Sequence, residues 1–379
     1  MSDEITIPYN EFKERVKRTQ RILIDKGFEG LVAISGYCER EGNVCYLTNH
    51  HTSFPPINDD ESVMGWGNSA VVLGVNGGPI LIAPLFYRED MIVGVEEVKT
   101  DRNLPKMIAE AIISKGLKGR IALIGSDIIP LSIYQELNRL LPQVKFEPAD
   151  EILINQRMIK SDFEIKLMKK ACKIADLALE ECMKFIKPGV SENELGIIAR
   201  KVALEAGADY IVRDRVYSGP WAGKQRWPFT TNRRVKDGEL VYVDLVGWYK
   251  NYAFDMLRTR VAGRMSKDQA HLIKIAQQCT DYMINLLKPE DSVKQIYLKI
   301  AEFMSEMKIQ GGPFGHGIGI EVVEKPIFHQ NNDTILKPNM ILCIEPKVTI
   351  PKIGTARFEE EVLITESGVE ILSHCPRDY

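Results

Sequence analysis

Two aspartates interrupt one otherwise apolar stretch of the chain, residues 240–259, which reads LVYVDLVGWYKNYAFDMLRT. The pattern predicts two β-strands joined by a short polar turn, with Asp244 in the first strand and Asp255 in the second. An aspartate inside an apolar strand is costly unless it is paired or binds a cation. If the two face each other across a hairpin, they repel by roughly 4 kcal/mol at about 4 Å and an effective dielectric of about 20. The stretch therefore predicts either a metal-binding pair or two surface aspartates on an edge strand.

Composition narrows the class of protein. With 379 residues the chain exceeds one usual domain, and we expect two domains, residues 1–155 and 156–379. The net charge of -3 gives no electrostatic reason to expect nucleic acid as a partner. No apolar run approaches the ~18 residues of a membrane span, and the polar N-terminus does not resemble a signal peptide, so no membrane partner is expected. Seven scattered cysteines without a CxxC pair predict reduced thiols in a cytoplasmic protein.

The periodicity of the apolar residues changes near residues 150–157. Before this point strands alternate with helices, which predicts an α/β domain with a mixed sheet. There we expect helices at residues 9–28, 103–115 and 131–141, and strands at residues 30–34, 43–48, 69–75, 78–84 and 120–125. Beyond it we expect long helices at residues 160–186, 191–208, 267–287 and 291–307, followed by loops and strands. Ser161, with Glu164 three residues later, predicts a capping box at the start of the first of these helices.

Two later segments each carry one unusual polar residue. His316 lies between glycines in GGPFGHGIGIEVVEKP, where the backbone can turn sharply and approach a ligand closely. A lone histidine is more often structural, and this alternative stays open. Glu345 interrupts the apolar strand NMILCIEPKV, and a buried glutamate in such a strand needs a partner.

A third segment, ARFEEEVLIT, is rich in charge. Strand alternation predicts that Arg357, Glu359 and Glu361 share one face and that Glu360 lies on the other. The candidate set then holds two aspartates, two glutamates and one histidine, and two divalent cations would neutralise its four carboxylates. Carboxylate and imidazole ligands suit Mn, Fe, Co or Zn. Two such ions about 3.5–4 Å apart would activate a bridging water and polarise a substrate carbonyl.

These residues and their local motifs resemble the pita-bread metallohydrolases of family M24, which include methionine aminopeptidase, prolidase, aminopeptidase P and the creatinase-like enzymes. The spacing of the aspartate pair and the motifs GHGIG, IEP and RFE match the family. The resemblance covers the chain from about residue 157 to its end and extends more loosely to GNVCYLTN near the N-terminus. It places the family's metal ligands at Asp244, Asp255, His316, Glu345 and Glu359.

The resemblance implies an α/β (α+β) fold with an N-terminal creatinase/prolidase-type domain and a C-terminal pita-bread catalytic domain. It further implies two divalent metal ions (Mn, Co, Zn or Fe), with Glu359 bridging them and Asp244 bidentate. The implied activity is that of an Xaa-Pro peptidase (prolidase or aminopeptidase P), in which a metal-bridging hydroxide cleaves an amide bond of a small peptide or small-molecule amide. Glu345 would relay protons, and Arg357 fits the arginine of the family's R-x-E motif.

The sequence departs from the family at two positions. The peptidases carry a histidine seven residues after the ligand histidine, where this chain has Val323. A second histidine of the peptidases falls at Arg226 or Trp227, and we expect Arg226 to supply charged donors in its place. Trp221 and Trp227 are candidates for an aromatic wall around the substrate, or for core or dimer packing. His329 is a candidate substrate-binding residue or an ordinary loop histidine.

Three functions remain open. The first is the dinuclear Xaa-Pro peptidase, and the second is a creatinase-like or ectoine-hydrolase-like C–N hydrolase or lyase acting on a small zwitterion. The third is a catalytically silent binding homologue. The resemblance also implies a homodimer, in which His50, His51 and residues 53–62 of one subunit would cover the pocket of the other.

Overall fold

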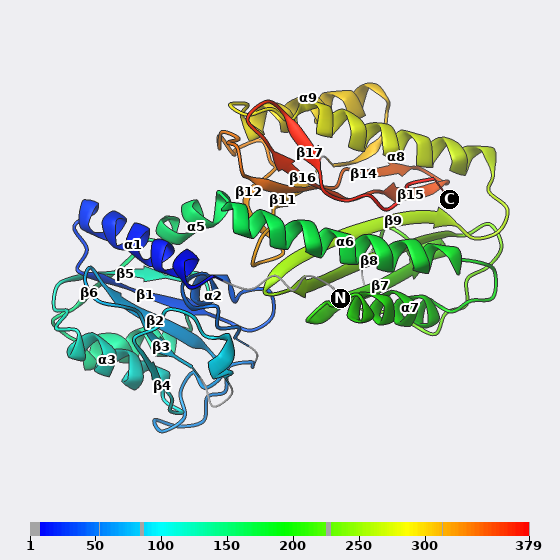
Figure 1. Ribbon diagram of the computed structural model, residues 1–379. Helices are drawn as coiled ribbons and strands as arrows, with labels where there is room; N and C mark the ends of the chain where they lie inside the picture. The colour runs from blue at the N-terminus through cyan, green and yellow to red at the C-terminus, as the bar shows by residue number, and fades with distance from the viewer. Residues whose placement is uncertain (1–7, 53, 84–86, 225–228, 313, 379) are drawn as a thin grey trace. The chain divides into compact units, whose positions relative to one another are not determined.

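The computed structural model describes residues 8–52, 54–83, 87–224, 229–312 and 314–378. The chain divides into two compact units, Met1–Arg157 and Met158–Tyr379 (Figure 1). Each unit buries a hydrophobic core of its own. Both units combine helices and sheets, so the predicted α/β class is confirmed.

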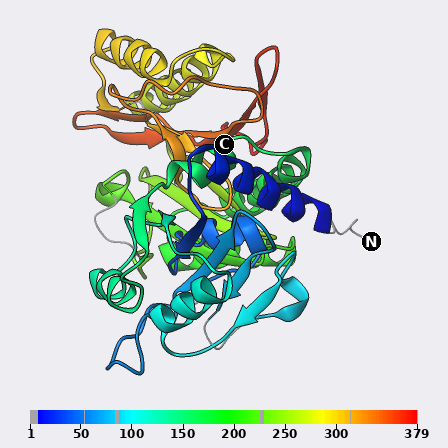
Figure 2. The same ribbon diagram turned by 90° about the vertical axis from the view of Figure 1, so that its left-hand side faces the viewer.

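The first unit is built on a mixed six-stranded sheet. Its strands, in spatial order, are β4 (Glu97–Lys99), β3 (Ile80–Ile82), β2 (Ser69–Gly74), β1 (Gly30–Ser35), β5 (Arg120–Ile124) and β6 (Lys145–Pro148). Figures 1 and 2 show helices on both faces: α1 (Tyr9–Asp25) and α2 (Gly42–Thr48) on one, α3 (Leu104–Ser114) and α4 (Leu131–Leu140) on the other. Alternate residues of β1, such as Val32 and Ile34, pack into the core that α3 and α4 cover. Helix α5 (Glu151–Met158) ends the unit.

The predicted strand at residues 43–48 is wrong, because the segment forms helix α2. All seven residues of α2 are buried, so the segment shows no polar face from which a helical period could be read. The hydroxyl of Ser35 accepts a hydrogen bond from the Val44 N–H at 2.9 Å and donates to the Glu41 carbonyl, which fixes the start of the helix. Asn49, with φ 60°, ends it in the left-handed conformation.

The second unit repeats one arrangement, a pair of helices followed by strands. The first half contains α6 (Asp162–Lys184) and α7 (Glu192–Glu205), followed by the antiparallel sheet β7 (Tyr210–Ser218), β8 (Leu240–Tyr249) and β9 (Tyr252–Val261). The second half contains α8 (Lys267–Leu286) and α9 (Val293–Glu306), followed by two further sheets. One has the order β10 (Gln310–Gly312), β14 (Lys347–Ile350), β15 (Gly354–Arg357). The other has the order β12 (Glu324–Ile327), β11 (Gly315–Gly317), β13 (Ile341–Ile344), β16 (Glu360–Ile364), β17 (Val369–Ile371).

The hairpin that the sequence predicts is formed by β8 and β9. The two ten-residue strands are joined at Lys250 and Asn251, whose φ angles of 49° and 66° give a turn with two left-handed residues. Helix α6 packs against both strands. The capping box at Ser161 is confirmed, since its hydroxyl accepts from the Glu164 N–H and the Glu164 carboxylate accepts from the Ser161 N–H.

Two further expectations concern membranes and thiols. Among the described residues, no helix combines the length and the apolar character that crossing a membrane would need. All seven cysteines are free, and only Cys38 of the seven is exposed.

We expect Ser161→Ala to lower the free energy of unfolding of the second unit by about 1 kcal/mol, because the change removes the acceptor that caps α6. Urea denaturation followed by tryptophan fluorescence would measure the loss. Ser305→Ala is the control, because Ser305 is exposed in α9 and its hydroxyl makes no hydrogen bond to the described residues. The control should change the free energy by no more than about 0.5 kcal/mol, and an equal loss in both variants would contradict the capping role.

Candidate functional site

The unusual polar residues of the sequence meet in one cavity of about 220 Å³ in the second unit. All five candidate metal ligands and Arg357 line it. Among the described residues, its lining consists of Arg213, Arg215, Asp244, Asp255, His316, Val323, Glu345, Arg357 and Glu359. Strands from both halves of the unit therefore supply the site.

The aspartate pair lies on one face of the hairpin. Asp244 is paired in register with Leu257, and Asp255 with Val246, so the two carboxylates are diagonal neighbours and not directly opposite each other. Asp244 is 6% exposed and Asp255 is 5% exposed. This burial excludes the alternative of two surface aspartates.

His316 is held in β11 between two neighbouring strands. It lies opposite Cys343 of β13 and Ile327 of β12. The flanking Gly317 is required by close packing, because a Cβ atom there would lie 2.3 Å from the Lys325 carbonyl oxygen. The His316 Nδ1–H donates to the Gly317 carbonyl at 2.9 Å. Its Nε2 consequently faces the cavity, 3.5 Å from Glu345 Oε1 and 3.7 Å from Asp255 Oδ2.

Arg357 joins the two site glutamates. Its guanidinium forms an ion pair with the Glu345 carboxylate through Nη2, and its Nε donates to the Glu345 carbonyl at 3.2 Å. Its Nη1 lies 3.2 Å from Glu359 Oε1. The arginine thus fixes the positions of both carboxylates that enter the cavity from this part of the chain.

The predicted common face of Arg357, Glu359 and Glu361 is wrong for the last residue. Strand β15 ends at Arg357 and β16 begins at Glu360, so the alternation does not continue across the two residues between them. The Glu361 carboxylate accepts hydrogen bonds from the Cys172 thiol at 3.0 Å and from the Asp255 N–H at 2.8 Å. Burial raises the pKa of Glu361 to about 8. Glu361 therefore supports the backbone of a candidate ligand from behind the cavity.

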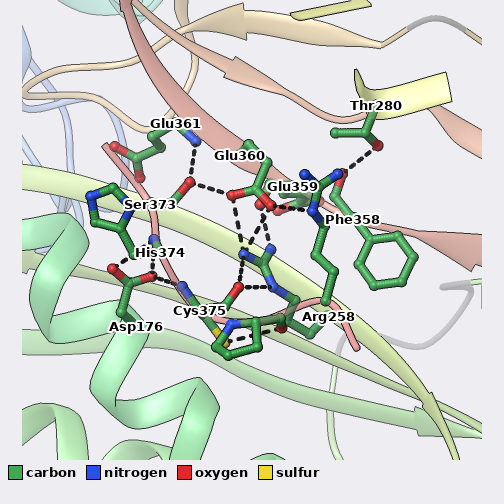
Figure 3. A network of polar contacts seen from close by, with 12 residues as sticks. Asp176, Arg258, Thr280, Phe358, Glu359, Glu360, Glu361, Ser373, His374 and Cys375 are labelled. Carbon is green, nitrogen blue, oxygen red and sulfur yellow. Dashed lines mark hydrogen bonds and ion pairs between the residues drawn. The ribbon is translucent and has the colours of Figure 1, made fainter. Parts of the chain in front are cut away.

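A buried arginine supports the neighbouring glutamate in the same way. Arg258 is 1% exposed, and its Nη1 donates to the Glu359 carbonyl at 2.6 Å (Figure 3). Its Nη2 donates to the Cys375 carbonyl at 2.8 Å and lies 3.0 Å from Glu360 Oε1. Asp176 of α6 accepts hydrogen bonds from the backbone N–H of Cys375. This network holds the Glu359 backbone between β9 and the end of the chain.

The electrostatics of the cavity favour a bound cation. Burial, and next the charge of Asp255, raise the pKa of Asp244 from 3.8 to about 6. Burial also raises the pKa of Glu359 well above its ordinary value and lowers the pKa of His316. Within the described part of the chain, Glu359 Oε2 is buried and has no hydrogen-bond partner. All these groups would be stabilised by a positive charge placed among them.

The arrangement of donor atoms fits a divalent metal. Carboxylate oxygens of Asp244, Asp255 and Glu359 all lie within 4.8 Å of one another. A second group, in which donor atoms lie equally close, combines Asp255 and His316 with the Cys343 thiol. Asp255 belongs to both groups, which is suitable for a residue shared between two ions.

Several predicted substrate residues are not among the described residues that line the cavity. Arg226 and Trp227 lie outside the described residues. Trp221 is 52% exposed in the short helix Gly219–Trp221 and is not part of the described cavity lining. His329 is exposed and is also not part of the described cavity lining. Its Nδ1 accepts a hydrogen bond from the Asn331 N–H. Val323, by contrast, lines the cavity.

His50 and His51 belong to the first unit. His50 is buried, and its Nε2 lies 2.9 Å from the Ser69 hydroxyl. His51 Nδ1 lies 3.8 Å from the Glu41 carboxylate. Burial lowers the pKa of each histidine to about 4.

Two site residues were missed in the sequence. Arg213 and Arg215 lie in β7, opposite Val246 and Asp244 of β8. Both side chains line the cavity. The sequence signal was an alternating Arg-x-Arg within a strand next to the hairpin, and it becomes meaningful only when the pairing of β7 with β8 is known.

Comparison with known proteins identifies relatives of both units. The sequence model of metallopeptidase family M24 matches residues 166–366, and that of the creatinase/prolidase N-terminal domain matches residues 15–159. The Xaa-Pro dipeptidase of Pyrococcus horikoshii is 29% identical over 311 residues, which cover 80% of this chain and 88% of that protein.

Solved structures show the same fold. The prolidase from Pyrococcus horikoshii OT3 superposes with a TM-score of 0.81 at 24% identity, covering 96% of this chain and 99% of that one. The X-Pro aminopeptidase from Thermotoga maritima MSB8 gives a TM-score of 0.83 at 22% identity, covering 96% and 98%. The predicted creatinase/prolidase-type domain followed by a pita-bread domain is therefore confirmed.

We expect Asp244 to lower the stability of the metal-free protein by about 3 kcal/mol as the pH rises from about 4 to about 6, because the folded state binds the Asp244 proton more tightly than the unfolded chain. Asp244→Asn should remove this part of the pH dependence and make the metal-free protein more stable than wild type near pH 7. Urea denaturation of chelator-treated protein at several pH values would measure both effects.

Asp214→Asn is the matched control for this experiment. Asp214 lies on the neighbouring strand, and its carboxylate pairs with Arg200 at 2.6 Å. The control should keep the pH dependence of the wild type. Glu361 supplies a separate part of the dependence, because burial raises its pKa to about 8. A dependence as steep in Asp244→Asn as in wild type would show that Asp244 is not a destabilised group.

Proposed function

The chain belongs to metallopeptidase family M24, and we propose that it is a dinuclear Xaa-Pro dipeptidase of the prolidase type. The observation that carries the proposal is the convergence of Asp244, Asp255, His316, Glu345 and Glu359 in one buried cavity. The relative from Pyrococcus horikoshii, which bears the name Xaa-Pro dipeptidase, supports the choice of substrate class. The proposed domains are residues 1–155, of the creatinase/prolidase type, and residues 156–379, which contain the cavity.

The five residues would hold two divalent ions, Mn, Co, Zn or Fe, for which oxygen and imidazole ligands are suitable. When bound, such ions supply an activated bridging hydroxide and polarise the carbonyl of the scissile amide. Glu359 would help to hold the ions, because its buried Oε2 has no hydrogen-bond partner among the described residues while its Oε1 is near Arg357. His316 donates through Nδ1, so its Nε2 would be the ligand atom.

Glu345 is the proposed proton carrier. Its Oε1 faces His316 Nε2, and its Oε2 is paired with Arg357, so the carboxylate reaches the cavity in a fixed orientation. It would take a proton from the attacking water and deliver it to the amide nitrogen that leaves. Arg357 would hold both Glu345 and Glu359 in place through its separate nitrogen atoms.

The family resemblance supports two further parts of the proposal. One is a homodimer, in which the segment around His50 and His51 would cover the pocket of the partner subunit. The other is a cytoplasmic location, for which seven free cysteines are the supporting observation.

A second candidate function rests on Val323. This residue lines the cavity at the position where the family's peptidases carry a histidine, and it offers no hydrogen-bond donor. Loss of one such donor commonly costs about 100–1000-fold in rate. The alternative is therefore a creatinase-like or ectoine-hydrolase-like C–N hydrolase or lyase acting on a small zwitterion.

The primary test is release of proline from Xaa-Pro dipeptides by Mn- or Co-loaded protein, with chelator-treated protein as the control. We expect metal-dependent release that Asp255→Asn and His316→Ala abolish together with metal binding. Arg264→Gln, at an exposed position that is not part of the described cavity lining, should behave like wild type. Metal binding without release of proline from any dipeptide would overturn the dipeptidase and leave the zwitterion enzyme or a silent binding homologue.

Val323→His tests the choice between the two enzymes. For a dipeptidase we expect the histidine to add a donor beside the scissile amide and to raise kcat for Xaa-Pro dipeptides by at least about tenfold. Steady-state kinetics would measure it, with Val323→Leu as the control for side-chain size. If the histidine gives no gain over leucine, the result favours the small zwitterion.

A further inference from the structure

A pair of arginines lies beside the carboxylates of the cavity, and we propose that this pair binds a carboxylate of the substrate. The arginine pair consists of Arg213 and Arg215. The inference rests on the proposed amide hydrolase, for which it specifies the substrate: a peptide or amide with an acidic group near the scissile bond.

The register of β7 places the pair next to the candidate metal ligands. Arg215 lies directly opposite Asp244, and Arg213 lies opposite Val246, two residues further along the same face of β8. Asp214, between them, points to the other face and pairs with Arg200 of α7. The two guanidinium groups therefore reach the cavity from one side, next to the position proposed for the metal ions.

The charges of the cavity change when metal binds. Without metal, four carboxylates face three arginines, so the charges nearly balance. Two divalent ions would neutralise the carboxylates and leave an excess of positive charge in the cavity. A substrate carboxylate would restore the balance, and guanidinium groups bind carboxylates through paired hydrogen bonds.

The three arginines are not equivalent. Arg357 is committed to Glu345 and Glu359. Arg215 forms no ion pair with any residue that the structure describes, although it lines the cavity. Its guanidinium is thus placed to receive a ligand. The competing explanation is that the arginine pair only balances the carboxylates of the metal-free protein.

The test compares charged and neutral substrates with wild type and Arg215→Gln. One arm measures kcat/KM for Glu-Pro against Gln-Pro, and the other measures Ala-Pro against Ala-Pro amide. Because one charge-assisted pair accounts for about tenfold to a hundredfold in binding, we expect wild type to prefer the charged substrate by that factor in one arm. Arg215→Gln should lose the preference in that arm. A preference for Glu-Pro would identify an acidic side chain as the bound group, and a preference for Ala-Pro over its amide would identify the C-terminal carboxylate.

Arg200→Gln is the matched control, because it removes an arginine that pairs with Asp214 on the other face of β7. Arg215→Lys keeps the charge and should retain part of the preference, which guards against a folding defect in the glutamine variant. Absence of a preference in wild type, or an unchanged preference in Arg215→Gln, would overturn the proposal. Tighter metal binding by Arg215→Gln without any change of preference would establish the competing explanation.

A binding measurement separates this proposal from the proposed function. Isothermal titration of Mn-loaded protein with free glutamate and with free glutamine requires no turnover. If no dipeptide is hydrolysed, a preference for glutamate that Arg215→Gln abolishes would still support the anion subsite. Equal binding of glutamate and glutamine by wild type would leave only the C-terminal carboxylate as the source, and equal binding of proline and proline amide as well would overturn the proposal.

Discussion

Four carboxylates that converge in a cavity of about 220 Å³ impose the main constraint on the second unit. Each must leave water, and each repels the others, so burial and next the charge of Asp255 move the pKa of Asp244 toward neutrality. Within the described residues, Arg357 relieves part of this repulsion by pairing with Glu345 and Glu359. The aspartates of the hairpin receive no comparable ion pair from Arg357, which explains why the site suits added cations.

Positioning of the carboxylates depends on backbone contacts behind the cavity. Arg258 binds the Glu359 carbonyl, and the Glu361 carboxylate binds the Asp255 N–H (Figure 3 shows the first of these contacts). Both contacts are fully buried, where a lost hydrogen bond leaves a costly unsatisfied group. Because they act on main-chain atoms, they fix the strands that carry the ligands, and the ligand side chains remain available to the cavity. This support comes from residues two or three positions away from candidate ligands: Glu361 follows Glu359 by two, and Arg258 follows Asp255 by three.

The sequence predicted those features whose energetic cost depends on neighbouring residues in the chain and not on the tertiary fold. Asp244 and Asp255 stood out because a carboxylate within an apolar strand requires a partner wherever the strand lies. Helix α2 could not be predicted, since a short segment buried on every side shows no periodicity. Arg213 and Arg215 could not be assigned to the cavity, because an irregularity in pairing between Ile211 and Arg213 decides which side chains of β7 face β8 on that side. Such a bulge depends on tertiary packing and leaves no simple pattern.

Arg213 and Arg215, which were missed in the sequence, bear on which group of a substrate the cavity would bind. A histidine donor titrates near neutral pH, whereas a guanidinium stays protonated throughout the range in which proteins are stable. In the described lining, Val323 removes one histidine that the peptidases use, and the arginine pair supplies donors of constant charge. Such donors suit a group on the substrate that is permanently negative, and they suit less well an oxyanion that exists only in the transition state. The proposed anion subsite therefore fits an acidic substrate better than it fits direct replacement of the lost histidines, and Arg215 would be the residue that decides substrate preference.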